Sequence, residues 1–224
     1  MPDNAPIWKF EVVTQNLSYL LAGLEMTLLL AVVSMVLGVL LGLLVAAARL
    51  SRFLLIRAIA GFYVDVWRST PFLAQILWVF FALPIVTGFR ISAFAAGIIC
   101  LSCHASAYLA EVFRAGILSI SGGQRHAALA LGMTRFQAAY RIVLPQALTR
   151  MLPAIGSQSI NLVKESALVS VINLQELMWY AQSLAGFTMR SIEILTAAAL
   201  IYAALTYPQA LLVNYLHRKY VVQS

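Results

Sequence analysis

Long apolar runs alternate with short, mostly basic polar segments along the chain. The first run, residues 17–48, is interrupted by Glu25 and a few small polar side chains. As a helix it would measure roughly 48 Å, longer than the ~30 Å hydrocarbon core of a bilayer, so we expect it to tilt or to begin in the interface. Four further runs are long enough to cross a bilayer, at Ala58–Leu83, Ile91–Phe113, Met151–Ile172 and Ile192–Leu216. The pattern predicts an all-α integral membrane protein with about five spans, the second of which ends at Pro84.

The composition supports this prediction. Hydrophobic residues make up 62% of the chain and charged residues 10%, whereas about a quarter of the residues of a soluble domain are charged. Cys100 and Cys103 lie within an apolar run, where small residues pack helices together, so we expect neither a disulfide nor a metal site there. His104 and His217 stand alone in the sequence, and we interpret them as packed or interfacial. We find no metal-ligand spacing and no pairing of a nucleophile with a base, so we predict no enzyme and no bound metal.

The basic residues set the orientation, because Lys and Arg are retained on the cytoplasmic side of a membrane. If the N-terminus lies outside, the cytoplasmic set is Arg49, Arg52, Arg57, Arg114, Arg125, Arg135, Arg141, Arg150, Arg218 and Lys219, and the outer set is Lys9, Arg90 and Arg190. This imbalance predicts an outside N-terminus, a cytoplasmic C-terminus and a cytoplasmic segment at 117–150. The net charge of +7 follows from this topology, and we expect no nucleic-acid partner.

The cytoplasmic segment reads RHAALALGMTRFQAAYRIVLPQALTR from residue 125 to residue 150. Its first part is rich in helix formers up to Leu131, and Gly132 suits the position just after a helix. Thr134 can cap a second helix that runs through Val143 and is stopped by Pro145. The pattern predicts helix, turn, helix, and by itself it also fits a hairpin lying among lipid headgroups.

The same segment resembles the cytoplasmic loop of permease subunits of bacterial ABC importers, which reads E-A-A-x-x-x-G followed by I-x-L-P. Here His126–Gly132 reads HAALALG, and Ile142–Pro145 reads IVLP at the matching interval. Three further stretches resemble the polar amino acid branch of that family, which includes histidine, glutamine, glutamate and arginine permeases. They are RSTPFLAQ (68–75), SAYLAEVFRAGILSI (106–120) and KESALVSVI (164–172).

The resemblance implies a type I ABC importer permease fold, with residues 1–224 as one transmembrane permease domain in the bacterial inner membrane. It implies import of a polar amino acid, with the loop at 117–150 coupled to a separate dimer of ATP-binding subunits. ATP and Mg would be bound by those subunits, since this chain has no G-x-x-x-x-G-K-[ST] loop. The other implied partners are a second permease subunit, identical or paralogous, an external solute-binding protein and membrane lipid. The implied coupling residues are Gln124, Arg125, His126, Ala127, Ala128, Gly132, Arg135 and Pro145.

One position departs from the family pattern. Where the family has glutamate, this chain has His126, which offers no permanent carboxylate to an arginine of the ATPase. The contact with the ATPase therefore either uses another partner group, is weaker, or depends on the glutamate of a paralogous second permease.

Ionisable residues inside membrane spans are costly unless they pair or line an aqueous path. Asp65 with Arg68, and Glu111 with Arg114, have the i, i+3 spacing of helical ion pairs, and we predict structural roles for both pairs. Because Pro71 follows closely, the first pair also fits a place where the second span begins or bends.

Lys164 and Glu165 fall in the fourth predicted span, and Asn161, Ser166 and Ser170 flank them. This cluster offers both signs of charge, as a path for a zwitterion requires, so we predict that these five residues line the substrate path. A buried pair that fixes helix packing is an equally good interpretation. The same two charges also allow an alternative function, an ion-coupled secondary carrier, although such carriers have more spans and inverted repeats, which we do not find here.

Overall fold

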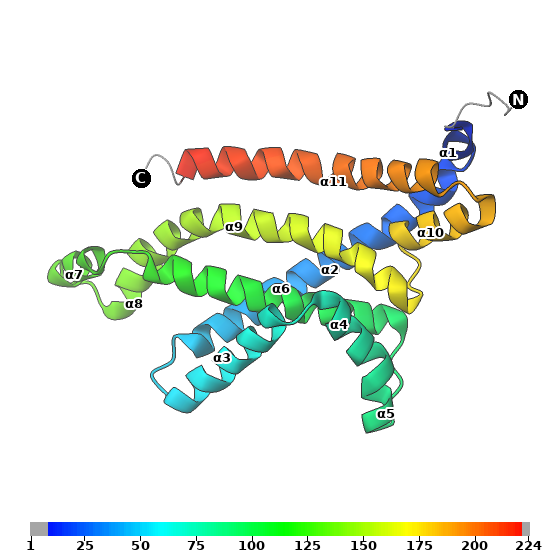
Figure 1. Ribbon diagram of the computed structural model, residues 1–224. Coiled ribbons are helices and arrows are strands. Elements are labelled where there is room, and N and C mark those ends of the chain that lie inside the picture. Colours follow the sequence, from blue (N-terminus) through cyan, green and yellow to red (C-terminus); the bar gives the residue numbers. More distant parts are fainter. Residues whose placement is uncertain (1–8, 221–224) are drawn as a thin grey trace, which may run out of the picture.

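The computed structural model describes residues 9–220, and every regular element in that range is a helix (Figure 1). Four long helices form the body of the molecule: α2 (Leu17–Arg49), α6 (Ala93–Leu118), α9 (Leu144–Glu165) and α11 (Ser191–Tyr220). Residues 1–8 and 221–224 of the predicted domain lie outside this described part. The prediction of an all-α protein is confirmed for the described range.

Small residues bring α2 and α6 close together. A Cβ atom added at Gly38 would lie 2.8 Å from Ala105 Cβ, and one added at Gly42 would lie 3.0 Å from Leu109 Cβ. Such close approach is typical of helix packing in membranes, where apolar burial alone does not drive helices together. The α2–α6 pair is therefore the rigid framework to which α3, α9 and α10 attach.

The second predicted span is not one helix. Helix α3 (Leu54–Ser69) and the helical segment Phe72–Thr87 meet at an angle of 105°. Thr70 and Pro71 are extended at the break, because a proline disfavours helical backbone in the residue before it. Figure 1 shows α3 and α5 diverging from α6 on either side of this bend. The predicted second span is therefore bent at Pro71, the place where the sequence allowed a bend.

The segment after the bend consists of α4 (Phe72–Leu77), the π-helical η1 (Trp78–Ala82) and α5 (Leu83–Thr87). Pro84 does not end this helix as predicted. It lies in the first turn after the wider π turn, where its missing N–H is not needed. The helix ends instead at Gly88, which has a φ of 76°.

The insert at 117–150 contains α7 (Gly122–Ala130), α8 (Arg135–Ala138) and the π-helical η2 (Ala139–Val143). The predicted helix–turn–helix is present, but Pro145 does not stop the second helix. This proline lies in the first turn of α9, again after a π turn, so η2 continues directly into α9. The insert is therefore connected to α9 by unbroken helix.

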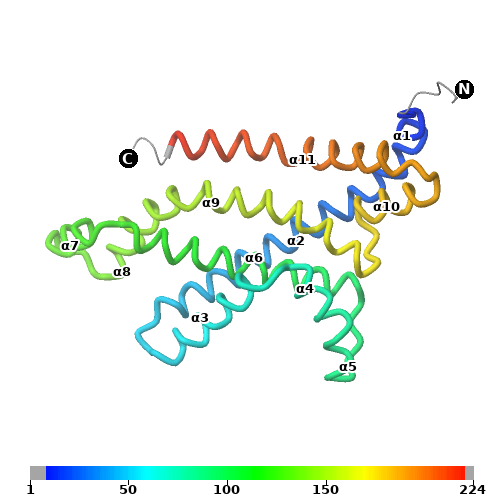
Figure 2. Tube along the Cα trace, in the orientation of Figure 1, coloured from blue at the N-terminus to red at the C-terminus, as the bar shows by residue number. Residues whose placement is uncertain are grey.

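The remaining elements are α1 (Glu11–Gln15), the 3₁₀ helix η3 (Ser166–Ile172) and α10 (Leu177–Thr188). Figure 2 shows α1, α10 and the start of α11 at one end of the molecule, and α7, α8 and the end of α11 at the other. The first and last described helices thus end on opposite sides, as an odd number of spans requires.

Three helices in the range 9–220 are long and apolar enough to cross a membrane: α2, α6 and α11. The bent pair of α3 with Phe72–Thr87 makes a fourth crossing if it counts as one span. Helix α9 is not among them, because polar side chains such as Gln158 and Lys164 interrupt its apolar positions. The total of five spans stays a prediction.

Large apolar side chains cover the outer faces of several helices. Leu44 on α2, Phe62 on α3 and Leu200 on α11 are 68%, 73% and 64% exposed, respectively. Soluble monomers rarely expose contiguous apolar surface on this scale, whereas hydrocarbon chains of lipid cover it without cost. The exposed faces agree with the membrane protein that the sequence predicts.

Candidate functional site

The insert forms a compact projection, here called the α7–α8 knob (residues 121–143). Gly132 has a φ of 79° and turns the chain between its two helices. Thr134 begins α8 with a capping box, in which its hydroxyl accepts the Gln137 N–H and the Gln137 side-chain oxygen accepts the Thr134 N–H. These features give the knob a defined shape although little of it is buried.

The predicted coupling residues lie mostly on the surface of this knob. Those that are exposed are Gln124, Arg125, His126, Ala127, Gly132, Arg135 and Pro145, whereas Ala128 is buried. Leu131, Phe136 and Tyr140 are also 82%, 78% and 64% exposed. Apolar side chains this exposed, next to arginines and at one end of the molecule, are typical of a surface that another protein covers.

The base of the knob is tied to the transmembrane helices. Arg150 of α9 donates from Nη1 to the backbone oxygen of Ser119, at 2.7 Å, and so joins α9 to the end of α6. Just beside this bond, Met151 fills the space next to Gly116, where a Cβ atom would lie 2.4 Å from its side chain. The knob and the inner ends of α6 and α9 therefore form one packed unit.

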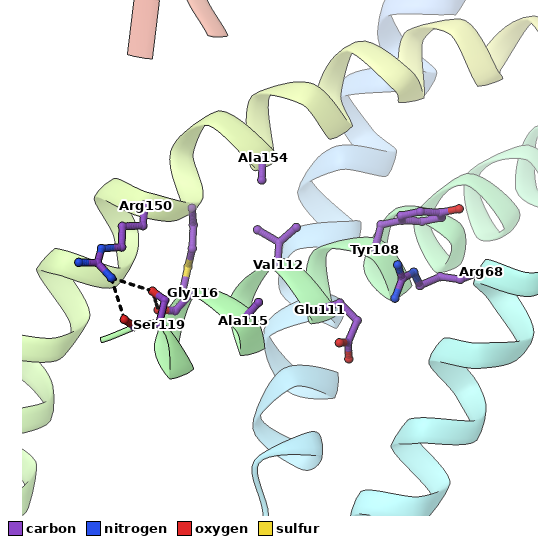
Figure 3. A pocket seen from close by; sticks show the side chains of 10 residues that line it. Arg68, Tyr108, Glu111, Val112, Ala115, Gly116, Ser119, Arg150 and Ala154 are labelled. Carbon is purple, nitrogen blue, oxygen red and sulfur yellow. Dashed lines mark hydrogen bonds between the residues drawn. The ribbon is translucent and has the colours of Figure 1, made fainter. Parts of the chain in front are cut away.

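A cavity of about 590 Å³ lies between α6 and α9 above this base (Figure 3). Its lining comprises Arg68, Tyr108, Glu111, Val112, Ala115, Gly116, Ser119, Arg150, Met151 and Ala154. Figure 3 shows Arg150 bonded to Ser119 at one end of the cavity and Arg68 beside the Tyr108 ring at the other. The cavity thus combines charged groups of both signs with an aromatic ring.

Glu111 forms ion pairs with an arginine of α2 and with an arginine of its own helix, α6. One carboxylate oxygen lies 2.9 Å from Arg49 Nη2 at the end of α2, and the other lies 2.8 Å from Arg114 Nη2 on α6. The Arg114 contact has the expected i, i+3 spacing, and its guanidinium approaches through both Nε and Nη2. Arg49 and Glu111 are far apart in the chain and meet only because α2 packs against α6, so the sequence did not predict this pair.

Asp65 and Arg68 do not form the predicted ion pair; no such contact exists among the described residues. The guanidinium carbon of Arg68 instead lies 5.1 Å from the centre of the Tyr108 ring, a cation–π distance. Arg68 stands in the last turn of α3, next to the bend, and this places its side chain across to α6. Asp65 faces a different cavity of about 390 Å³, which Arg49, Arg57 and Arg114 also line.

The five predicted substrate-path residues are not one cluster in the structure. Asn161 and Lys164 are exposed on α9, whereas Ser166 and Ser170 are buried and donate their hydroxyls to backbone oxygens one turn earlier in the chain. Glu165 is partly buried at the end of α9, and its Oε1 lies 3.3 Å from His104 Nε2. Among these five residues, Glu165 is therefore the one whose side chain contacts another transmembrane helix through a charge.

The sequence suggested that His104 stands alone, but in the structure its side chain has polar neighbours on both sides. Its Nδ1 lies 3.2 Å from Gln75 Oε1, on the far side of the ring from Glu165. Phe72 and Tyr108 pack against the ring at centroid distances of 5.3 and 5.0 Å. His104 thus connects the bend after α3 with the end of α9. The isolated position of His104 within the third apolar run was the signal available in the sequence.

The family model described as "Binding-protein-dependent transport system inner membrane component" matches residues 38–222. This range contains the knob, the cavity and the bend between α3 and α4. The chain belongs to this family. It is therefore a transport component of the inner membrane, and membership of this family counts against the alternative of an ion-coupled secondary carrier.

Individual members of the family are similar over nearly the whole chain. The arginine transport system permease protein ArtQ of Bacillus subtilis (strain 168) is 39% identical over 196 residues, which cover 88% of this chain and 90% of that protein. The glutamine transport system permease protein GlnP of Escherichia coli (strain K12) is 34% identical over 201 residues, covering 89% and 92%.

The fold is also that of a family member of known structure. A chain from the "Crystal structure of an amino acid ABC transporter with histidines" superposes with a TM-score of 0.89 at 36% sequence identity. The match covers 95% of this chain and 99% of that chain. The type I ABC importer permease fold implied by the sequence is thereby confirmed.

Sequence analysis missed a buried polar cluster at the end opposite the knob. Glu176, the N-cap of α10, is fully buried and accepts from the Trp179 N–H, the Tyr202 hydroxyl and the Thr27 hydroxyl. Glu176 lies between the predicted fourth and fifth spans, and burial raises the pKa of its carboxyl group. A glutamate immediately before an apolar helix is a weak signal of an N-cap, and this was the one signal in the sequence. Its hydrogen-bond partners on α2 and α11 could not be predicted from sequence spacing.

Proposed function

We propose that this chain is the transmembrane subunit of an ATP-driven importer that takes up a polar amino acid or a related small zwitterion. Family membership carries this proposal, and the arginine and glutamine permeases among its relatives favour an amino acid as the solute. A solved structure similar to this chain, that of an amino acid ABC transporter with histidines, also favours an amino acid as the solute.

The proposal requires partners that supply energy and specificity. The described knob exposes Leu131, Phe136 and Tyr140 beside arginines, which suits docking on a dimer of ATP-binding subunits. ATP and Mg are bound and ATP is hydrolysed in those subunits, since this sequence has no phosphate-binding loop. A second permease subunit completes the path, and an external solute-binding protein delivers the solute. The domain comprises residues 1–224, with the coupling loop at 117–150.

Transport follows an alternating-access cycle in this proposal. Closure of the ATPase dimer pushes the knob, and the continuous η2–α9 helix and the Arg150–Ser119 bond carry the displacement to α6 and α9. The cavity between those helices, with Arg68, Tyr108 and Glu111, lies on the moving parts. Glu165, with Lys164 and Asn161 exposed nearby on α9, offers charges to a zwitterion farther along the path.

The test is uptake by the purified complex. The chain is copurified from native membranes with its associated subunits, reconstituted in proteoliposomes with the solute-binding protein, and supplied with radiolabelled amino acids. We expect accumulation only when ATP and Mg are present on the knob side. Accumulation by this chain alone without nucleotide would contradict the proposal and favour a secondary carrier.

A Gly132→Val substitution in the knob is expected to reduce ATP-dependent uptake by about fivefold to thirtyfold. Its φ of 79° costs a residue with a Cβ about 1–2 kcal/mol, and that strain displaces the turn between α7 and α8. Gly122→Val is the matched control, because a Cβ also meets nothing within 4 Å there and its φ is not positive. Equal uptake by the two variants would show that the turn is not part of coupling.

A His126→Glu substitution is expected to preserve or strengthen the association with the ATPase. His126 is exposed on α7, so a glutamate fits there without repacking and restores the carboxylate of the family pattern. The measurement is the amount of ATPase that copurifies with tagged permease, compared with Gln124→Glu, which places the same charge two residues away. Complete loss of the complex in His126→Glu alone would rule this account out.

A further inference from the structure

The His104 side chain is held between two oxygen atoms. Its Nδ1 lies 3.2 Å from Gln75 Oε1, and its Nε2 lies 3.3 Å from Glu165 Oε1. The side chain is almost fully buried between two aromatic rings, so water does not separate it from either neighbour. Which ring nitrogen carries a proton is therefore decided by what the two oxygens can do.

The amide of Gln75 has one possible orientation. Its Nε2 lies 2.9 Å from the Trp67 backbone oxygen, 3.1 Å from the Thr70 backbone oxygen and 2.6 Å from the Thr70 hydroxyl. The two backbone oxygens accept only, so the NH₂ group must face them and the amide oxygen must face His104. Nδ1 of His104 therefore donates a proton to Gln75.

A neutral imidazole carries one N–H, and Gln75 already uses it. Nε2 would then turn a lone pair toward a carboxylate oxygen of Glu165, which is repulsive. The arrangement requires one further proton between Nε2 and Oε1. Whether that proton belongs to an imidazolium or to a carboxylic acid, the pair of His104 and Glu165 has no net charge.

The surroundings offer Glu165 no other described counter-charge. Its Oε2 is buried without a hydrogen-bond partner. Arg68 of α3 lies over Tyr108, Lys164 points to the exposed face of α9, and Arg49 of α2 pairs with Glu111. No ion pair joins Glu165 to the other charged side chains of α2, α3, α6 and α9, which are Glu25, Arg57, Asp65, Arg114 and Arg150. Helices α4 and η3 contain no charged residue. A carboxylate left unbalanced here would be costly.

We propose that Glu165 exchanges the proton it shares with His104 for the ammonium or guanidinium group of an amino acid in transit. This inference rests on the proposed function and adds to it. The cation binds the carboxylate, the proton shared by Nε2 and Oε1 leaves to water along the exposed part of Glu165, and Nδ1 keeps the proton donated to Gln75. The net charge of the site is the same before and after. The Glu165 side chain is 24% exposed although its Oε2 is buried and unpartnered, so a cation that reaches the side chain finds an acceptor without a donor once the carboxyl group turns toward it.

The experiment measures equilibrium binding of radiolabelled arginine and glutamine to the purified permease–ATPase complex in nanodiscs, without the solute-binding protein or nucleotide. Binding is measured across a range from about pH 6 to about pH 8. Because one proton leaves as one cation binds, the affinity of the wild-type complex should rise with pH, with a limiting slope of about tenfold per pH unit. Glu165→Gln has no shared proton to release, so its affinity should be equal at both ends of this range. Glu165→Gln should bind at least about tenfold more weakly than wild type at the upper end.

A pH slope in Glu165→Gln equal to that of wild type would overturn the inference, as would wild-type affinity in Glu165→Gln at the upper end of the range. So would the absence of binding in a complex that still accumulates the amino acid with ATP, whereas the absence of ATP-dependent uptake would overturn the proposed function itself. A measurement on the unaltered chain does not depend on how the variants fold. Nitrogen-15 NMR of histidine-labelled empty complex, with the His104 signals assigned by their loss in His104→Gln, should show a protonated Nδ1 and a shared proton at Nε2; a bare Nε2 facing an ionised Glu165 would contradict it.

Discussion

Glu176→Ala is expected to lower the stability of the folded chain by about 3–5 kcal/mol. The carboxylate is fully buried and accepts from the Trp179 N–H at 2.8 Å, the Tyr202 hydroxyl at 2.6 Å and the Thr27 hydroxyl at 3.3 Å. An alanine leaves these donors without their acceptor in a place that water does not reach. It also removes the cap of α10 and the link from α10 to both α2 and α11.

The measurement is the midpoint of thermal unfolding of detergent-solubilised protein, followed by fluorescence-detected size-exclusion chromatography. Glu25→Ala is the control, because Glu25 is an exposed glutamate on α2 and its removal should change little. Equal midpoints for Glu176→Ala and Glu25→Ala would contradict the prediction.

The same carboxyl group predicts a dependence on pH. Burial raises the pKa of Glu176, so the folded state holds its proton more tightly than the unfolded state does. Its contribution to stability is complete below the ordinary pKa of glutamate and is lost as the pH rises through the raised value. Glu176→Gln, which is always uncharged, should therefore gain stability relative to wild type as the pH rises.

Gly23→Ala is expected to cost about 2–3 kcal/mol although it adds one methyl group. Its Cβ would lie 2.8 Å from both the Cα and the backbone N of Leu177, and 2.7 Å from Cδ2 of Tyr180. Tyr180 can rotate, but the backbone of Leu177 cannot move without shifting the start of α10 away from α2. That shift also breaks the bond between the Leu177 N–H and the Thr27 hydroxyl.

Gly186→Ala is the matched control with the opposite expected sign. It lies within α10, and a Cβ there meets no atom within 4 Å. Alanine favours helix over glycine by about 1 kcal/mol, so this variant should be slightly more stable than wild type. The two unfolding midpoints, measured in the same detergent, should move in opposite directions. A Gly23→Ala protein at least as stable as wild type would show that α10 is not seated on α2 as described.

Both predictions concern the end of the molecule opposite the knob. There α10 is held on α2 by Gly23 and on both α2 and α11 by Glu176. Helix α10 is fixed on its neighbours at one end of the molecule, and the knob is packed against α6 and α9 at the other. Between these ends lie the bend at Pro71 and the junction of α9 with η3. His104 connects these two places through Gln75 and Glu165.

The sequence alone determined that the chain is helical and belongs in a membrane, because apolar runs of bilayer length have no other stable solution. It also located the knob, since Gly132, Thr134 and the intervals between the motif residues are local features. Local rules left a bend at Pro71 open and failed at Pro84 and Pro145, because a proline alone does not distinguish a bend, a continuing helix and a helix end. The adjacent π turns decided the two continuing cases.

Only the tertiary structure decided the polar contacts, because they join residues far apart in the chain. Asp65 and Arg68 have the spacing of an ion pair along a helix, yet Arg68 lies over the Tyr108 ring because α3 packs against α6. Glu165 had been grouped with its neighbours in sequence, and its charged contact came from His104 on another helix. A periodic pattern determines which side chains share a face of one helix, whereas which faces meet depends on how all the helices pack together.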